Sequence, residues 1–380
     1  DVCLGDLTGN GKIDFLVKRL GDDNTVGNDS AYNYIEAYTM EGERLWYIDC
    51  GPNTLSNGAV ELNAVSFDWD MDGRCEVVAR FGDGAIIHDA NGVEHVIGSL
   101  DVNTRYNGME YTYTGDEWLV YLDGKTGVPY HIGPTEHPEY MTYPLLRGSD
   151  SDWGTGIVGH RSSKYFFGAP FLDGHHPSIF LARGAYSQHK MAAYDVDPLT
   201  HQLTQIWEWH NNVSTRPWYG NGFHNYCVAD VDWDGRDEIV YGSMVIDDNG
   251  LGLSTTGLGH GDAQHCSDFD PYRHGQEIFT CNEAKPCNNY RDATTSTIYY
   301  RLVGNDDDGR AMCANVSDAY PGAEAASAAS GIINCCSAKV IDGWTNNWYT
   351  GNDPMALNFR IYWDGDLLEE TVNSPGTEKE

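Results

Sequence analysis

The stretch Asp230-Val-Asp-Trp-Asp-Gly-Arg-Asp-Glu238 has acids at its first, third, fifth and ninth positions and a glycine at its sixth. Acidic oxygens in this spacing can surround a hard cation, while the glycine permits the sharp turn that the loop needs. The run Ile239-Val-Tyr241 follows directly. β-Branched and aromatic residues bounded by turn residues are typical of a strand. The stretch therefore predicts a cation-binding loop that leads into a β-strand.

The same pattern recurs along the chain. Close copies begin at Asp6 and Asp68, and looser copies begin at Asp268 and Asn315. Apolar hairpins with Gly, Asp or Asn turns lie between the loops, and helix signals are nearly absent. Repetition of such a unit is typical of a propeller built from four-stranded blades. We expect an all-β propeller over residues 1–370, with about seven readable blades, and a loose C-terminal end over 371–380.

The composition excludes several classes of partner. The 380 residues carry 23 Lys and Arg against 57 Asp and Glu, a formal net charge of −34. Such a surface repels nucleic acid and anionic membranes. The 24 Tyr, 11 Trp and 11 Phe supply more aromatic surface than disordered chains carry, so we expect a folded protein. No apolar stretch is long enough to insert into a membrane.

The acidic loops predict structural calcium sites. Calcium suits them better than magnesium, which requires a smaller and stricter octahedron. The alternative, Asx-turns without a metal, stays open for each loop. The expected ligands are Asp68, Asp70, Asp72 and Glu76; Asp230, Asp232, Asp234 and Glu238; Asp268, Asp270 and Glu277; and Asp6, Asn10 and Asp14.

A second set of residues occupies equivalent places in consecutive repeats. His224 precedes Asp230 by six residues, and Asp262 precedes Asp268 by six residues. His260 shares a glycine-rich loop with Asp262, and Glu283 follows the next expected strand. Equivalent places in a propeller face the same mouth of its channel. We therefore predict one metal site of two imidazoles and two carboxylates, for which zinc, manganese and calcium all stay possible.

Longer runs add a family resemblance. Residues 222–250 and 254–265 resemble rhamnogalacturonan lyases of polysaccharide lyase family 11, as do four shorter motifs: Asp173-Gly-His-His-Pro-Ser178, Tyr290-Arg-Asp-Ala293, Gly309-Arg-Ala-Met312 and Ile361-Tyr-Trp-Asp-Gly-Asp-Leu-Leu368. The resemblance implies an eight-bladed, calcium-rich propeller that cleaves the rhamnose–galacturonic acid backbone of pectin by β-elimination. It implies an active-site calcium on the second residue set. Arg310 and Arg291 are then expected to bind the acidic plant polysaccharide.

The resemblance leaves several alternatives open. Lys285, Arg310 and His265 are the candidates for the catalytic base, because a basic group beside a metal can have a lowered pKa. The substrate could instead be a polymer of rhamnose and glucuronic acid. A noncatalytic, calcium-stabilised propeller for adhesion or glycan binding is a further possibility. We expect a secreted or cell-surface protein, and a full protein longer than this chain, because family members continue past the equivalent of Asp366.

Overall fold

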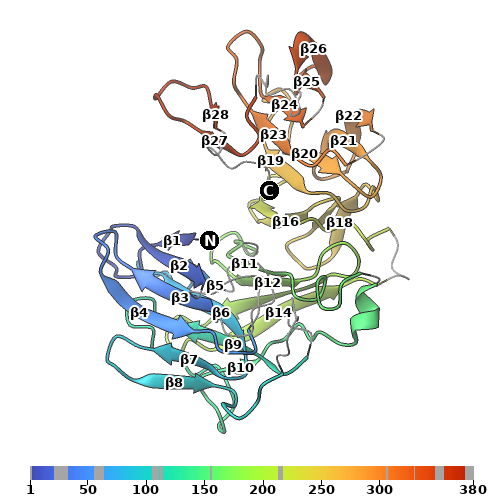
Figure 1. Ribbon diagram of the computed structural model, residues 1–380. Coiled ribbons are helices and arrows are strands. Elements are labelled where there is room, and N and C mark those ends of the chain that lie inside the picture. Colours follow the sequence, from blue (N-terminus) through green and yellow to red (C-terminus); the bar gives the residue numbers. More distant parts are fainter. Residues whose placement is uncertain are drawn as a thin grey trace. The chain divides into compact units, whose positions relative to one another are not determined.

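The computed structural model describes residues 2–20, 33–54, 64–104, 111, 114–154, 156–212, 217–304, 307–328, 330–346 and 355–372 (Figure 1). Among these residues, strands make up the regular structure, with one short 3-10 helix, η2 (Asp150–Trp153), and no α-helix. The all-β class predicted from the sequence is therefore confirmed. No helix in these ranges has the length and apolar character needed to cross a bilayer.

The chain packs as two compact units. The first unit comprises Asp1–Phe171, His175–Gly184 and His189–His210, and the second comprises Leu172–Gly174, Ala185–Gln188 and Asn211–Glu380. The prediction of a single domain over 1–370 stays a prediction. The predicted loose end needs a correction, because Thr371 and Val372 pair with β27 inside a strand. Residues 373–380 lie outside the described residues.

The first unit contains three antiparallel sheets. The six-stranded sheet has the order β1 (Val2–Gly5), β2 (Asp14–Leu20), β3 (Asn33–Tyr38), β4 (Arg44–Asp49), β7 (Ala85–His88) and β8 (Glu94–Ile97). A four-stranded sheet has the order β10 (Met141–Thr142), β9 (Glu117–Leu122), β6 (Glu76–Gly82) and β5 (Ala64–Phe67). The third sheet contains β11 (Tyr165–Gly168), β12 (Ile179–Arg183), β13 (Lys190–Val196) and β14 (Leu203–His210).

The described part of the second unit contains three four-stranded sheets and one hairpin, and its strands pair in the order in which they follow along the chain. The first sheet has β15 (Cys227–Ala229), β16 (Glu238–Tyr241), β17 (Met244–Ile246) and β18 (Gly252–Thr255). The second has β19 (Ala263–Ser267), β20 (Glu277–Asn282), β21 (Cys287–Asp292) and β22 (Ile298–Val303). The third has β23 (Ala311–Ala314), β24 (Glu324–Ser327), β25 (Gly331–Asn334) and β26 (Lys339–Thr345), and β27 (Phe359–Ile361) pairs with β28 (Glu370–Val372).

Each repeated acidic loop joins the first two strands of a sheet. In five sheets of the described residues, the last acid of the loop opens the second strand and pairs with the last residue of the first, as in Phe67 with Glu76 and Ala229 with Glu238. The glycine at the sixth position has a positive φ in the two best copies, 90° at Gly73 and 93° at Gly235. The sequence repeat is therefore a structural repeat, and the glycine is required by the turn.

The second strands are the most buried. Every residue of β6, from Glu76 to Gly82, is buried, as is every residue of β20. Strands covered on both faces have continuous apolar runs, whereas the outer strand β14 is mostly exposed. This burial fixes the end of each acidic loop in a rigid position.

Candidate metal centre and surrounding residues

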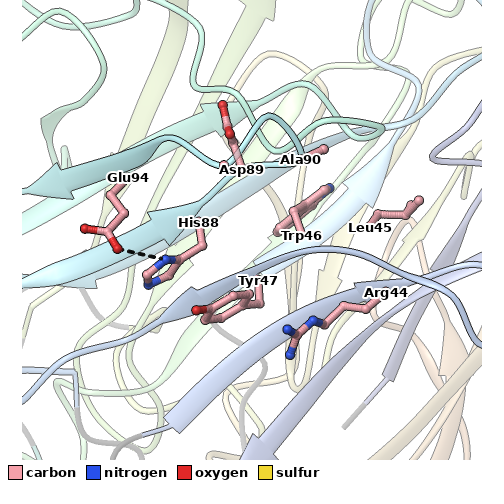
Figure 2. Close-up of a pocket in the computed structure, with 9 residues that line it drawn as sticks. Arg44, Leu45, Trp46, Tyr47, His88, Asp89, Ala90 and Glu94 are labelled. Atoms are coloured by element: carbon pink, nitrogen blue, oxygen red, sulfur yellow. Dashed lines mark ion pairs between the residues drawn. The ribbon is translucent and has the colours of Figure 1, made fainter.

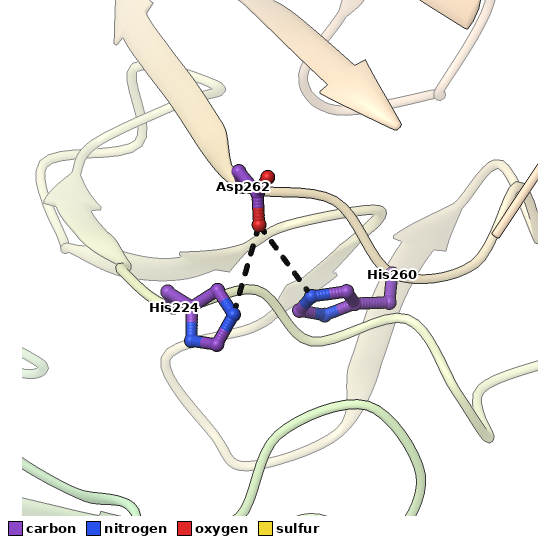
Figure 3. A group of neighbouring side chains, drawn as sticks. All are labelled: His224, His260 and Asp262. Carbon is purple, nitrogen blue, oxygen red and sulfur yellow. Dashed lines mark ion pairs between the residues drawn. The ribbon is translucent and has the colours of Figure 1, made fainter. Parts of the chain in front are cut away.

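His224, His260 and Asp262 come together in the second unit (Figure 3). The Oδ1 atom of Asp262 lies 3.6 Å from Nε2 of His224 and 3.8 Å from Nε2 of His260. Two ligands in adjacent positions around an ion at about 2.4 Å are separated by roughly this distance. The three ligand atoms can therefore share one cation.

Glu283 adds a second carboxylate to this group. Its Oε2 atom lies 3.7 Å from Nε2 of His260. The backbone amides of Glu283 and Ala284 both donate to the His260 carbonyl, at 2.9 and 3.0 Å. The turn after β20 is thus tied to the loop that carries His260. Three of the four residues predicted from repeat spacing form one ligand group, and Glu283 lies beside it through its contact with His260. We call the four residues the His260 site.

The orientation of His260 is fixed from behind. Its Nδ1 atom lies 2.7 Å from the Gly222 carbonyl, which can only accept a hydrogen bond, so Nδ1 carries a proton and, in the neutral imidazole, Nε2 keeps the lone pair. His260 itself is 3% exposed. A Cβ atom on the neighbouring Gly261 would lie 2.0 Å from the Cys281 carbonyl, so only glycine fits there. A buried imidazole held in this tautomer is suited to metal ligation.

Tyr186 belongs to the site although sequence reasoning missed it. Its hydroxyl lies 2.8 Å from Nε2 of His224, and its ring centroid lies 3.9 Å from that of His260. The backbone φ of Tyr186 is 66°, a left-handed conformation that a tyrosine rarely adopts. Strain of this kind concentrates at functional sites. Tyr186 lies outside the acidic loops, so no spacing rule pointed to it.

The charge balance around Asp262 favours a cation. Burial, followed by the carboxylates of Asp307 and Glu283, raises the pKa of Asp262 to about 6, and the guanidinium of Arg310 opposes this. Asp307 is a second residue that the sequence analysis missed. A bound cation would remove the repulsion among these acids.

The three candidate bases occupy different settings. The Lys285 ammonium donates to the Gly257 carbonyl at 2.6 Å, on the loop that leads to His260. Arg310 is exposed and close enough to Asp262 to affect its pKa. His265 lies on β19, and its Nε2 atom is 2.9 Å from the Ala311 carbonyl on β23. Burial lowers the pKa of His265, and its contact with Ala311 joins two sheets of the unit. The base role of each of the three stays a prediction.

The expectation for Arg291 needs a correction. Arg291 is 0% exposed on β21. Its Nη2 atom donates to the Gly242 carbonyl at 2.6 Å, and Nη1 donates to Thr280 and Asn289. A guanidinium enclosed by its own sheets cannot reach a polymer. Arg291 is therefore a structural residue.

The Asp68 loop gathers its predicted ligands. Atoms of Asp68, Asp70, Asp72 and Glu76 all lie within 4.8 Å of one another. Oε2 of Glu76 accepts from the Trp69 amide and the Tyr121 hydroxyl, both at 3.0 Å. Oε1 of Glu76 is buried and has no hydrogen-bond partner among the described residues. Four acids around an unsatisfied buried oxygen fit a bound cation.

The acids at the Asp230 loop belong to two groups that share no residue. Asp230, Asp232 and Asp234 form one, and Glu238 forms the other with Asp247 and Asp248, which directly follow β17. As in the Asp68 loop, Oε1 of the last acid is buried without a hydrogen-bond partner. Unlike Glu76, however, Glu238 lies outside the ligand group of its own loop, and a calcium site that combines it with Asp230, Asp232 and Asp234 stays a prediction.

Two predicted calcium loops are built differently. Asp268, Asp270 and Glu277 do not form a ligand group within the described ranges. Instead, Nε of Arg273 lies 2.5 Å from Oδ2 of Asp270, so a guanidinium takes the place expected for the metal. This site is a correction to the prediction.

In the first loop, hydrogen bonds within the loop dominate. Asp6 accepts from the amides of Gly9, Asn10 and Gly11. The Thr8 hydroxyl donates to Asp14 at 2.9 Å. These are the Asx-turn contacts of the metal-free alternative. Calcium on Asp6, Asn10 and Asp14 stays a prediction.

One acidic group was missed. Asp364, Asp366 and Glu370 gather in the hairpin between β27 and β28, and the Trp363 amide donates to Glu370 at 2.7 Å. In the sequence, residues 361–368 stood out as a motif of the family resemblance. The third acid of the group, Glu370, is the first residue of β28, just as Glu76 is the first residue of β6.

A separate pocket of about 340 Å³ lies on the six-stranded sheet of the first unit (Figure 2). The Tyr47 and His88 rings stack with their centroids 4.2 Å apart, and the Arg44 guanidinium lies 4.5 Å from the centroid of the Tyr47 ring. His88 also pairs with Glu94 at 3.4 Å. None of the residues predicted for the metal or substrate sites lines this pocket.

Successive antiparallel sheets and a histidine–carboxylate site define an all-β protein with a candidate metal centre. A family model described as "Rhamnogalacturonan lyase family 11, C-terminal domain" matches residues 1–379. The chain belongs to rhamnogalacturonan lyase family 11.

Characterised relatives agree with this assignment. The chain is 33% identical to the rhamnogalacturonan endolyase YesW of Bacillus subtilis over 388 residues, covering 100% of the chain and 58% of YesW. It is 34% identical to the exolyase YesX of the same organism, covering 98% and 59%. The chain thus spans under two thirds of these relatives.

Solved structures are similar as well. The crystal structure of YesW matches with a TM-score of 0.82 at 32% identity, covering 98% of this chain and 60% of that one. A Bacillus licheniformis rhamnogalacturonan lyase matches with a TM-score of 0.83 at 32% identity, with the same coverage of 98% and 60%.

Proposed function

We propose that the protein is a calcium-dependent rhamnogalacturonan lyase that cleaves the rhamnose–galacturonic acid backbone of pectin by β-elimination. Membership of family 11 and relatives named endolyase and exolyase support this. The proposal extends to a secreted or cell-surface location, where an acidic plant polysaccharide is encountered.

The observation that carries the proposal is the arrangement of His260. Its Nδ1 atom donates to the Gly222 carbonyl at 2.7 Å, and its Nε2 atom faces the carboxylates of Asp262 and Glu283. An imidazole buried for stability alone has no need of two carboxylates at its second nitrogen. This geometry fits a cation between them.

Calcium bound in the His260 site would supply positive charge beside the uronic carboxylate, where negative charge builds up during β-elimination. His224, His260, Asp262 and Glu283 would hold the ion. Two imidazoles also suit zinc or manganese, so calcium rests on the family resemblance and on the carboxylate share of the ligands.

Residues around the site would bind the sugar carboxylate and remove the proton. Arg310 is exposed and lies near Asp262, which suits it to bind a sugar carboxylate. Lys285 lies two residues after Glu283 and is a second basic group, besides Arg310, near the His260 site. Either could take the proton from the carbon beside the carboxylate. A charge-preserving exchange separates the roles, because Arg310→Lys should raise KM if Arg310 binds substrate.

The fold proposal is a calcium-rich propeller, eight-bladed in the complete protein. Support comes from the consecutive antiparallel sheets and from the acidic loop at the same place in successive sheets. The Asp68 and Asp230 loops are the proposed structural calcium sites.

The test is cleavage of purified rhamnogalacturonan, followed by the ultraviolet absorbance of unsaturated uronide ends. Activity should vanish after chelation and return with calcium but not with zinc or manganese. Saturated product ends, or full activity after calcium removal, would refute the lyase proposal. A rhamnose–glucuronic acid polymer in the same panel tests the alternative substrate.

The site itself is tested by His260→Ala, with His210→Ala as the matched control. His210 is an exposed histidine at the end of β14. We expect His260→Ala to lose activity and one calcium by calorimetric titration, with its unfolding transition retained. Calcium stoichiometry unchanged from that of His210→Ala would contradict the assignment.

A further inference from the structure

Three arginines in the first unit converge on a single carboxylate oxygen. Arg80 on β6 and Arg183 on β12 are 0% exposed, and Arg147 is 8% exposed. Nη2 of Arg80 lies 2.5 Å and Nη2 of Arg147 lies 2.8 Å from Oε1 of Glu117, and Nη2 of Arg183 contacts the same oxygen. The Tyr165 hydroxyl donates to it as well, at 2.5 Å. We call these residues the Glu117 cluster.

The cluster carries an excess of positive charge. Burial raises the pKa of Glu117, but the charges of Arg183, Arg80 and Arg147 outweigh burial and hold it well below its ordinary value. Glu117 is therefore ionised, and it balances one of three guanidinium charges. Among the described residues of the unit, no further carboxylate pairs with these guanidinium groups, so two positive charges are left over there. A buried charge without a counter-charge is strongly disfavoured.

The same guanidinium groups have donors that nothing in the described residues accepts. Nε and Nη1 of Arg80, Nε of Arg147 and Nε of Arg183 are buried without a hydrogen-bond partner. The Tyr143 hydroxyl, which belongs to the same surroundings, is also buried without one. Buried polar atoms are nearly always satisfied by protein, water or a bound ion. Excess charge and open donors together point to an anion.

The surroundings limit the size of that anion. The Arg80 guanidinium lies over the Tyr165 ring at 4.1 Å, and the Arg183 guanidinium lies over the rings of Tyr165 and Tyr143 at 4.8 and 5.6 Å. Aromatic rings cover their faces, so only the N–H edges can bind a ligand. With 0 to 8% exposure, a polymer cannot reach those edges.

We propose that a monovalent halide ion, chloride in ordinary solution, binds at the open N–H edges of the Glu117 cluster. It accepts from Arg80 and Arg183 and reduces the repulsion among the guanidinium groups. Arg80 and Glu117 lie in one four-stranded sheet, and Arg183 and Tyr165 lie in the next. The ion thus joins two sheets of the first unit. This inference is independent of the lyase proposal.

The direct test is a crystal of the full chain soaked in sodium bromide, with diffraction measured at the bromine absorption edge. We expect an anomalous peak in contact with Nε of Arg80 or Arg183. Bromide peaks confined to the surface, or a water molecule at these donors, would overturn the proposal.

A solution test uses the melting temperature as chloride replaces methanesulfonate at constant ionic strength. For a dissociation constant of about 1 mM, a 100-fold excess of chloride should raise Tm by about 2–5 °C. Arg147→Gln should reduce this rise at least about threefold, because it removes one excess charge. Arg44→Gln, at an exposed arginine, should retain it.

A milder variant keeps the test valid if Arg147→Gln does not fold. Tyr143→Phe removes one unsatisfied hydroxyl and preserves the ring over Arg183. We expect it to fold and to need several-fold more chloride for the same rise in Tm. A chloride response equal to that of the unmodified chain in every variant would overturn the proposal.

Discussion

Acid usually destabilises folded proteins, but without calcium this chain should become more stable as the pH falls from about 8 to about 5. Burial, followed by the charge of Asp70, raises the pKa of Glu76 from 4.5 to about 8 in the absence of metal. Burial likewise raises the pKa of Glu238 from 4.5 to about 8. These two acids are 0% and 1% exposed, so water screens them little. Both end loops that we propose to hold calcium.

The sign follows from proton binding. Between about pH 4.5 and about pH 8, the metal-free folded chain holds protons on Glu76 and Glu238 that the unfolded chain has released. The free energy of unfolding must therefore fall as pH rises through this window. The full pKa difference corresponds to roughly 5 kcal/mol per group, and structural relaxation reduces it to about 2–4 kcal/mol.

The assay is urea unfolding followed by tryptophan fluorescence, on chain freed of calcium and then of chelator. The metal-free chain should be more stable at about pH 5 than at about pH 8. Saturating calcium should stabilise the chain most at the higher pH, because protons compete for the same carboxylates.

Glu76→Gln isolates the contribution of one group, and Glu43→Gln, at an exposed acid, is the control. Glu76→Gln should flatten the pH dependence of the metal-free chain, and Glu43→Gln should leave it unchanged. A metal-free chain that becomes more stable with rising pH would refute the reasoning. So would an unaltered slope in Glu76→Gln.

Three further predictions concern packing. Gly261→Ala puts a Cβ atom 2.0 Å from the Cys281 carbonyl. We expect the free energy of unfolding in urea to fall by about 1–3 kcal/mol and calcium binding measured by calorimetry to weaken. Unchanged calcium binding would show that this loop does not position His260. Glu117→Gln leaves three buried guanidinium groups without their carboxylate and should cost about 3–5 kcal/mol in the same unfolding assay, whereas a neutral effect would mean that the arginines are solvated. Arg291→Met removes the donor to the Gly242 carbonyl and should lower stability by about 1–3 kcal/mol without changing KM for the polymer; a raised KM at full stability would restore Arg291 to the substrate site.

Periodicity in the sequence predicted the fold class because each acidic loop has a recognisable local spacing of acids and glycine. Glu76 and Glu238 each end a loop and open a buried strand, so the same residues that set the repeat also set the strand register. In the six-stranded sheet an acidic loop joins β1 to β2, but the β7–β8 hairpin has no loop of this nine-residue pattern. The β7–β8 hairpin adds to β4 through backbone pairing, which depends on contacts distant in sequence.

Repeat spacing also brought His224 and Asp262 together correctly, because equivalent positions in successive sheets lie at the same end of their strands. It could not find Tyr186 or Asp307, which reach the site from segments without an acidic loop. It misjudged Arg291, because burial depends on neighbouring sheets and leaves no sign in a local motif. It also misjudged the Asp268 loop, where the nearby Arg273 supplies the positive charge.

The most direct test of the central claim is a crystal structure of the calcium-loaded chain, with anomalous diffraction used to identify the ion. We predict a calcium ion at about 2.3–2.6 Å from Nε2 of His260 and from carboxylate oxygens of Asp262 and Glu283. Density at that position explained by water alone, or a calcium ion that does not contact His260, would contradict the account.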